Sequence, residues 1–347
     1  MNNDWKQFLE ESGASLAEGG VFRFTGDHQS GLADDGFICD LSHFSTVVIA
    51  GPDAVDFMQG QFTNDVSAVD DSHSELSAFC NNKGRMVANF RLFQYQQNYF
   101  FSVRADLVER CIEHLQHYVL SAQVAIQDVS EQLVHIGISG DHAETILSTY
   151  ISELNSEIDS VSKNDDYIAI RIAGDKPRYE IFCAADKART LWQDAASKMT
   201  VANGDTWDYL HIRSGLPFID MATSQEFVPQ MANMELINGV SFTKGCYTGQ
   251  EIVARTHYLG KQKRRTFRIR IESQQRPVPG DLLATDTSTD SQYIGTIINV
   301  YQLADGEFEA LAVIQMAATD GRLQLKGVES SITILELPYS LEADSTS

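Results

Sequence analysis

The chain of 347 residues is short of positive charge: 26 lysines and arginines face 48 aspartates and glutamates, giving a net charge of −22. A field of this sign repels polyanions, so broad binding of nucleic acid is not expected. No apolar run approaches the ~18 residues that a membrane helix needs, and the start, Met1 to Trp5, has neither the basic nor the apolar segment of a secretory signal. These absences predict a soluble, cytoplasmic protein without membrane contact.

Cysteine is scarce as well. The five cysteines, at positions 39, 80, 111, 183 and 246, are odd in number and contain no CxxC pair. This pattern argues for reduced thiols and against a disulfide framework or a zinc ribbon. The chain also lacks a Walker-type loop, an HExxH pair and a dinucleotide fingerprint. No metal site is predicted.

One cysteine has unusual neighbours. Cys246 lies between two glycines in the segment Lys244-Gly245-Cys246-Tyr247-Thr248-Gly249-Gln250-Glu251. Glycines allow sharp turns and close approach, and the nearby ammonium of Lys244 favours the reactive thiolate. A helix that begins near Gly249 would favour the thiolate further through its dipole. The alternative is a buried, inert cysteine in a tight turn, since free cysteine is often buried.

Two stretches of the chain are similar to each other. Residues 46–54 and 134–143 both read as a buried strand, a glycine turn at Gly51 or Gly140, and an acidic helix start. Each is followed by a predicted hairpin and a second helix, which favours a duplicated unit over a solenoid. In the first copy, Val55, Phe57 and Met58 are expected to face the core. In the second, the polar stretch 155–166 is expected to be a flexible connection.

The predicted hairpin of the first copy joins strands over 75–80 and 85–95. Its turn is Asn81-Asn82-Lys83-Gly84, where asparagine and glycine are expected to supply positive φ angles. Lys83 and Arg85 would be functional cations or plain solvated charges.

The last part of the chain has short strand-like runs separated by turns. They are Phe267–Ile271, Asp281–Ala284, Tyr293–Tyr301, Phe308–Ile314, Leu323–Leu325 and Ile332–Leu337. Six such runs predict a small β-barrel. The predicted fold class is therefore α+β: two related α+β modules over residues 20–130 and 131–260, which can be intertwined, and a C-terminal barrel over 261–347.

Basic residues gather after Cys246. Eight of the 26 fall within 22 positions, opposed in that stretch only by Glu272. They would form a positive mouth for a polyglutamate tail or for RNA phosphate, or else a solvated strand face, because some alternate with apolar residues. The candidate contacts are Arg255, Lys261, Lys263, Arg264 and Arg265.

The motifs, taken together, resemble the YgfZ family of folate-binding, tRNA-modifying proteins, which are relatives of the glycine-cleavage T-protein, an aminomethyltransferase. The segments that carry the resemblance are 242–251 around Cys246, 57–66, 82–86 and 336–341. The resemblance implies a three-domain ring around a shared pocket and tetrahydrofolate or a derivative as cofactor. It also implies support of tRNA modification and of the assembly or maintenance of iron–sulfur enzymes, including tRNA-thiolating enzymes, with weak tRNA contact.

The same resemblance implies site residues. Cys246 would act as nucleophile, redox thiol or transient ligand, with Lys244 assisting it. Trp207, Gln230 and Tyr247 would hold the folate, and Phe44 falls where the family has a second tryptophan. Gln230 stands where the transferases have a glutamate, and it can still pair with a pterin through its amide. The alternatives are an ordinary amide for Gln230 and core packing for the two aromatic rings.

The chain departs from the transferases after Gly84. Where they carry acidic residues, one of them catalytic, this chain has Val87-Ala88-Asn89, so nothing obvious steadies charge on a reacting nitrogen. Whether the chain is an enzyme is therefore left open. The alternatives to the main hypothesis are a folate-dependent one-carbon transferase of aminomethyl type and a non-catalytic folate-binding scaffold with an inert Cys246.

Overall fold

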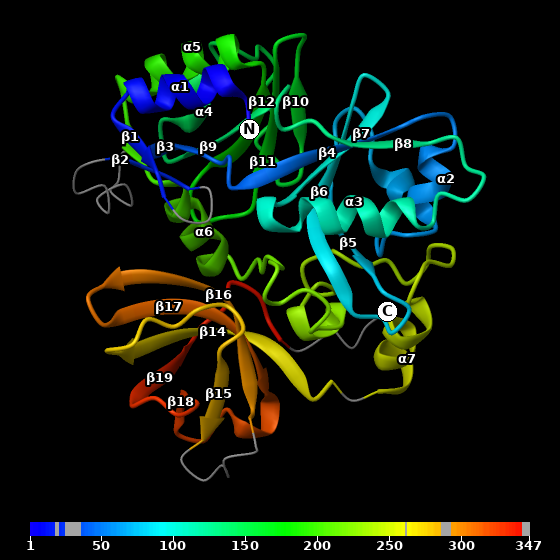
Figure 1. Ribbon diagram of the computed structural model, residues 1–347, viewed down its shortest axis with the longest axis vertical. Helices are drawn as coiled ribbons and strands as arrows, with labels where there is room; N and C mark the ends of the chain where they lie inside the picture. The colour runs from blue at the N-terminus through cyan, green and yellow to red at the C-terminus, as the bar shows by residue number, and fades with distance from the viewer. Residues whose placement is uncertain (18–20, 25–35, 261, 286–292, 342–347) are drawn as a thin grey trace. The chain divides into compact units, whose positions relative to one another are not determined.

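The structure is a computed structural model that describes residues 1–347 except 18–20, 25–35, 261, 286–292 and 342–347. The described chain divides into two units, each made of separate segments (Figure 1). Unit 1 contains Met1–Met58, Val66–Glu75 and Phe90–Trp207, and unit 2 contains Gln59–Asp65, Leu76–Asn89 and Asp208–Ser347. The predicted division into three domains in a ring stays a prediction.

Two sheets follow one plan, which confirms the predicted duplication. The first copy runs β4 (Phe44–Ala50), α2 (Ala54–Gln59), β5 (Glu75–Cys80), β6 (Met86–Tyr95), β7 (Asn98–Arg104) and α3 (Val108–Gln116). The second runs β9 (Val134–Ser139), α4 (Ala143–Leu147), β10 (Val161–Lys163), β11 (Tyr167–Ile172), β12 (Arg178–Cys183) and α5 (Ala185–Ala196). In space the strands lie in the orders β5-β6-β7-β4 and β10-β11-β12-β9, so each copy is a strand, a helix, a three-stranded meander and a helix.

The two glycine turns of the repeat have the same backbone conformation. Gly51 and Gly140 have φ angles of 123° and 121°, and the carbonyl of each accepts a hydrogen bond from the alanine that begins the next helix. At Gly51 a Cβ atom would lie 2.2 Å from the carbonyl oxygen of Gln123. Only glycine fits this turn without strain.

Each sheet also takes a strand that precedes the other copy. Strand β3 (Phe37–Asp40) comes just before β4 in the chain but pairs antiparallel with β9, whereas β8 (Ala125–Asp128) comes just before β9 and pairs antiparallel with β4. Strand β13 (Thr200–Ala202) then extends the second sheet by pairing parallel with β3. The two copies are therefore intertwined through exchanged strands.

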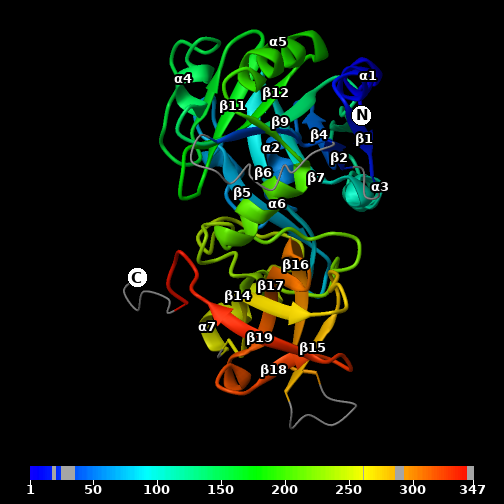
Figure 2. The same cartoon turned by 90° about the vertical axis from the view of Figure 1, so that its left-hand side faces the viewer.

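The core of unit 1 lies between the six-stranded sheet and three helices. Trp5 and Leu9 of α1 (Asn3–Glu11), Ile146 of α4 and Trp192 of α5 are buried together with side chains of β9 and β12. Figures 1 and 2 show α1, α4 and α5 on the same side of this sheet. A small hairpin of β1 (Ala14–Leu16) and β2 (Phe22–Phe24) follows α1, and the single turns η3 (Val66–Ala68) and η4 (Ala105–Leu107) complete this part.

Two local predictions are wrong, and a third is wrong in part. Val55 is 37% exposed, because α2 turns Ala54, Phe57 and Met58 inward instead. The stretch 155–166 contains β10, an edge strand held by pairing with β11. In the turn after β5, Gly84 alone has positive φ; the Asn81 side chain contributes by accepting hydrogen bonds from the backbone N–H groups of Lys83 and Arg85.

Unit 2 contains the closed barrel, drawn from yellow to red in Figures 1 and 2. Its six strands confirm the prediction: β14 (Arg264–Ser273), β15 (Leu282–Thr285), β16 (Gly295–Ala304), β17 (Glu307–Gln315), β18 (Leu323–Leu325) and β19 (Ser330–Leu335). Before it come α6 (Gly204–Arg213), η5 (Pro229–Ala232) and α7 (Gln250–Leu259), and η6 (Met316–Ala318) follows β17. Among the described residues, no helix is long and apolar enough to cross a membrane.

Candidate functional site

Cys246 is the exposed cysteine of the chain. It lies in the loop that leads into α7, whereas Cys39, Cys80, Cys111 and Cys183 are buried. Burial raises the pKa of the Cys111 thiol to about 12 and raises the pKa values of Cys80 and Cys183 as well. Because the thiolate is the reactive form, those three sealed thiols are poor nucleophiles at neutral pH. Only Cys246 combines a thiol with access to reagents in solution.

The loop is fixed where it joins the helix. Gly249 has φ +84° and caps α7, which begins at Gln250 as the sequence predicted. A Cβ on Gly249 would lie 2.5 Å from the Asn81 carbonyl oxygen and 2.9 Å from Cα of Gly84. The hairpin turn after β5 therefore packs directly against the end of the cysteine loop, and this close approach requires glycine on both sides.

Lys244 fixes the other side of the loop. Its Nζ donates hydrogen bonds to the backbone carbonyls of Phe62 at 2.7 Å and Asn64 at 2.6 Å, and it lies 5.4 Å from the centre of the Tyr247 ring. Thr248 adds a hydrogen bond from its backbone N–H to the Gly60 carbonyl. Lys244 thus has a structural role that the sequence did not suggest. Its predicted effect on the thiol stays a prediction.

Tyr247, which follows Cys246 in the loop, is only 6% exposed. Burial raises the pKa of its phenol well above the usual range, so the ring is neutral. This position gives Tyr247 a packing role next to Cys246. Its predicted contact with folate stays a prediction.

Gln230 is a buried amide with one open acceptor. Its side chain is in η5, 1% exposed, and Nε2 donates to the Val253 carbonyl at 2.7 Å. Within the described residues, the buried Oε1 has no hydrogen-bond partner. An unsatisfied buried acceptor costs about 1–3 kcal/mol, so this oxygen is the atom of Gln230 that could accept a hydrogen bond from a bound group. Of the alternatives for Gln230, an ordinary amide on the surface is excluded by this burial, whereas an ordinary amide in a turn agrees with its place in η5.

The predicted cationic cluster is divided by ion pairs. Arg265 is buried and binds Glu235 at 2.6 Å, and Arg268 and Arg270 both face the buried carboxylate of Glu309. Acids distant in sequence therefore neutralise part of the cluster, which the count along the chain missed. Arg255 and Lys263 are exposed, Arg264 lies 5.5 Å from the Tyr293 ring centre, and Lys261 is outside the described residues.

Trp207 and Phe44 belong to unit 1, whereas the cysteine loop belongs to unit 2. Trp207 is fully buried, with the Arg178 guanidinium 5.3 Å from its ring centre and Phe37 edge-on to it. A Cβ on Gly137 would lie 2.7 Å from the indole. This is the packing expected of a core tryptophan. A contact with folate stays a prediction.

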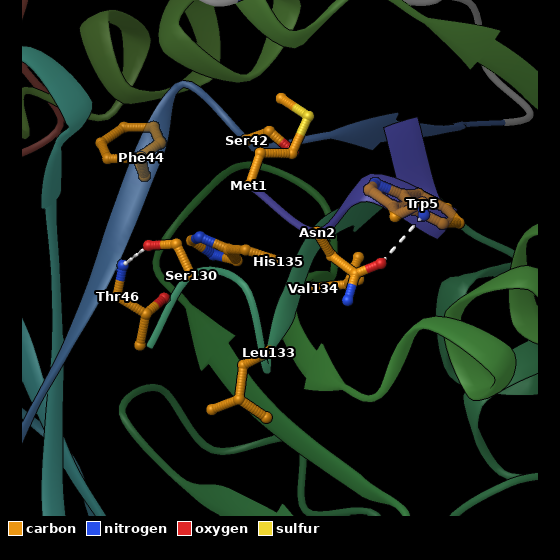
Figure 3. A pocket seen from close by; sticks show the side chains of 10 residues that line it. All are labelled: Met1, Asn2, Trp5, Ser42, Phe44, Thr46, Ser130, Leu133, Val134 and His135. Atoms are coloured by element: carbon orange, nitrogen blue, oxygen red, sulfur yellow. Dashed lines mark hydrogen bonds between the residues drawn. The ribbon is translucent and has the colours of Figure 1, made fainter. Parts of the chain in front are cut away.

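Phe44 is 5% exposed and lies beside His43, His135 and Arg104. Figure 3 shows it at the wall of a small cavity together with His135 and Ser130. The cavity has a volume of about 10 Å³, which holds about one water molecule and no pterin ring. Phe44 therefore packs as a core side chain, and its predicted stacking on folate would need this cavity to open.

Asn89 takes the place of the transferases' acidic residue in the local sequence. It is buried, donates from Nδ2 to the Pro217 carbonyl at 2.7 Å and accepts at Oδ1 from the Ile219 N–H at 2.9 Å. A carboxylate could not donate the first of these bonds. The amide is thus used in holding β6 to the chain at 217–219.

A cluster next to the cysteine loop was missed by the sequence reading. His257 of α7 stacks on Phe242 at 3.7 Å between ring centres and contacts Glu235 through Nδ1 at 3.3 Å. Tyr258, 66% exposed, meets both rings edge-on. The sequence did contain a signal for this cluster, the run His257-Tyr258-Leu259 at the end of a helix. Aromatic and apolar residues that are exposed at a helix end do not contribute to the core, so such a run indicates a contact with another molecule. Among the described residues there is no group of three or more metal-binding side chains.

Comparison with known proteins agrees with the motifs. The GCVT N-terminal domain family model matches residues 21–240. The chain is 31% identical over 306 residues to the tRNA-modifying protein YgfZ of Pectobacterium carotovorum subsp. carotovorum (strain PC1), covering 88% of this chain and 92% of that protein. It is also 31% identical over 309 residues to the tRNA-modifying protein YgfZ of Yersinia pestis (strain Pestoides F), with 88% and 93% covered.

The fold has a solved counterpart. The glycine cleavage system aminomethyltransferase T from Bartonella henselae matches with a TM-score of 0.75 over 97% of both chains, at 16% identity. This likeness confirms the aminomethyltransferase-like α+β fold. Together with the two relatives and the GCVT match, it places the chain in the YgfZ family of the aminomethyltransferase-like superfamily.

Proposed function

We propose that this protein binds tetrahydrofolate or a derivative and supports tRNA modification and the assembly or maintenance of iron–sulfur enzymes, using Cys246 as its reacting group. The observation that carries the proposal is the exposure of Cys246 in a loop whose two sides are fixed by Lys244 and Gly249, while the other four cysteines are buried. A fixed, accessible thiol serves group transfer or redox exchange, whereas an inert thiol needs no such anchoring. The naming of the relatives as tRNA-modifying proteins supports the process.

The open Oε1 of Gln230 supports the cofactor. A pterin presents ring N–H donors, which this buried acceptor would bind. Trp207, Tyr247 and Phe44 are the aromatic side chains that the family resemblance assigns to the folate site. When bound, a reduced folate supplies a carrier for a one-carbon unit. Gln230 would orient the ring, and the loop of Cys246 would present the thiol.

A transferase of aminomethyl type is the less favoured function. Both hydrogen-bonding ends of Asn89 are used within the fold, so this residue has no acidic group to offer to a reacting amine. Incubation with methylene-tetrahydrofolate and candidate amines, followed by mass spectrometry, tests this alternative. Formation of a one-carbon product would favour it over the main proposal.

The main test replaces the thiol. We expect Cys246→Ser, expressed in a strain that lacks its own copy of the gene, to lose support of tRNA thiolation, measured by mass spectrometry of modified nucleosides. The matched control is Thr243→Ala, which changes an exposed side chain of the same loop and should retain full support. Full thiolation with Cys246→Ser would contradict the role of the thiol.

Folate binding is tested separately. Titration calorimetry with a stable tetrahydrofolate derivative should show binding to the wild-type protein and weaker binding to Gln230→Met, which keeps the volume and removes both the acceptor and the Nε2 donor to the Val253 carbonyl. Equal affinity in the two proteins would remove Gln230 from the folate site. Tryptophan fluorescence is recorded during the same titration for the wild type and for Trp207→Phe. A ligand-dependent change that is present in the wild type and lost in the variant would show that the indole of Trp207 senses the ligand.

A further inference from the structure

The exposed end of α7 carries an aromatic platform. Phe242 and His257 form a stacked pair with 16° between their planes, and Tyr258 stands at 83° to His257 and 72° to Phe242. These edge-on contacts orient the Tyr258 ring, yet 66% of its surface is exposed. Tyr293, the other exposed tyrosine in the described part of unit 2, is 41% exposed and covered by the Arg264 guanidinium. Tyr258 is therefore the ring best placed to receive a flat partner.

The His257 ring is fixed from its far side. Glu235 contacts its Nδ1 at 3.3 Å, and the same carboxylate binds the buried Arg265 at 2.6 Å. Arg265 in turn donates to the Gln230 carbonyl. This chain of contacts ties the platform to the barrel strand β14.

Two exposed basic residues lie near the platform in the sequence of this otherwise acidic protein. Between residues 250 and 265 the sequence has five basic residues and one acidic residue, Glu251. Of these, Arg255 and Lys263 are exposed. Lys83 is exposed on the hairpin turn whose Gly84 lies against Ile252 at the other end of α7. Exposed rings between separated cations are the pattern that proteins use to bind single-stranded nucleic acid, with bases on the rings and phosphates at the cations.

The platform also lies close to the thiol in the chain. Phe242 and Cys246 are four residues apart in one loop, so their Cα atoms are separated by at most about 14 Å. A nucleotide stacked on Tyr258 would hold its neighbours in the strand near Cys246. The acidic surface elsewhere repels RNA, so a local contact of this kind would give affinity for one region of an RNA without binding RNA broadly.

We propose that Tyr258, supported by Phe242 and His257 and close in the chain to the exposed cations Arg255 and Lys263, is a stacking site for unpaired nucleotides of tRNA. The inference rests on the proposed role in tRNA modification. It predicts that loop nucleotides bind and that a fully paired RNA duplex, whose bases are already stacked, does not.

The test measures binding of a fluorescein-labelled anticodon stem-loop RNA to the full chain by fluorescence anisotropy at low salt. Tyr258→Ala should weaken binding about tenfold, since stacking of one base contributes on the order of that factor. Tyr258→Phe keeps the ring and should stay within about twofold of wild type. Leu259→Ala is the matched control, because this neighbour is 84% exposed but has no ring. Arg255→Gln should reduce the slope of log affinity against log salt by about one.

Two results would overturn the inference: no stem-loop binding at low salt, or equal binding by Tyr258→Ala. Equal binding can come with full tRNA thiolation in Tyr258→Ala cells or with loss of thiolation. The last would assign the surface to a protein partner. Thermal unfolding of each variant checks that α7 is intact. Cys246→Ser should bind the stem-loop like wild type, so failure of the thiol hypothesis and failure of the platform are distinguishable.

Discussion

Lys244 donates a hydrogen bond from its ammonium to the backbone carbonyl of Asn64 at 2.6 Å, and so joins the cysteine loop to a segment far earlier in the chain. With the bond to Phe62, this contact makes a residue expected to act on a thiol into a structural anchor. The two roles make different predictions.

Lys244→Met should lower the free energy of unfolding by about 1–3 kcal/mol, because two hydrogen bonds from a charged donor are lost. Urea unfolding followed by circular dichroism measures the change. Lys263→Met, at an exposed lysine, is the control and should have little effect. Unchanged stability of Lys244→Met, with slower alkylation of Cys246, would show that the lysine acts on the thiol alone.

Gly249→Ala should be strongly destabilising or should displace the loop. The added Cβ would lie 2.5 Å from a backbone oxygen at a residue with φ +84°, so both clash and backbone strain oppose it. Gly245→Ala, at the other glycine beside Cys246, meets nothing within 4 Å and should fold like wild type. Thermal unfolding and the alkylation rate of Cys246 compare the pair. Equal behaviour would mean that the hairpin does not hold the loop.

Breaking the Arg265–Glu235 pair should be costly. Both side chains are largely buried, and removing one partner of a buried pair costs about 3–5 kcal/mol. We therefore expect Arg265→Met to lose stability on this order in urea unfolding, while Arg255→Met, at an exposed site, changes little. The double variant Arg265→Met with Glu235→Gln should lose less than the sum of the single losses. Strict additivity would show that the pair is not coupled.

The stability of unit 1 should contain a pH-dependent contribution from Asp40. Burial raises the pKa of this carboxyl above 3.8, although Trp5 and Ser42 donate hydrogen bonds to it. The folded state therefore binds a proton that the unfolded state releases, and this contribution to stability falls as pH rises from 3.8 through the raised pKa. Asp40→Asn removes the titration and keeps an acceptor for Trp5.

The difference in unfolding free energy between wild type and Asp40→Asn, measured in urea across this pH range, isolates the effect from the many other acids. It should shift in favour of the variant as pH rises. A difference that is flat with pH, or that shifts toward the wild type, would contradict the raised pKa.

Local patterns predicted much of the fold. All six barrel strands coincide with runs of apolar residues between turn signals. The repeat could be predicted from Gly51 and Gly140, because both turns need glycine at the same positive φ. Strand β10 was missed, since its polar sequence is held by pairing with β11 and not by its own pattern. The exchange of β3 and β8 was beyond any local signal, because pairing partners are chosen by the whole sheet.

The candidate site divides in the same way. Cys246 could be predicted as a site residue from the sequence, because glycines on both sides of a cysteine are typical of a tight, exposed loop. The pairing of Arg265 could not, because Glu235 lies 30 positions away in the sequence. The platform of Phe242, His257 and Tyr258 was missed for a similar reason: ring contacts depend on how the loop returns along α7.

The exchange of β3 and β8 constrains synthesis. On the ribosome β3 emerges long before β9, its antiparallel partner. Until β9 is made, the backbone N–H and C=O groups of β3 must be hydrogen-bonded by water or covered by a chaperone. The first sheet waits likewise for β8. The five strands of the first sheet all lie within residues 44–128, so that sheet can form before the second copy is made, whereas the second sheet needs β3 from near the start of the chain. A chain that ends before residue 125 would leave the first sheet without its edge strand β8, and a fragment that begins after residue 40 would leave β9 without its antiparallel partner β3.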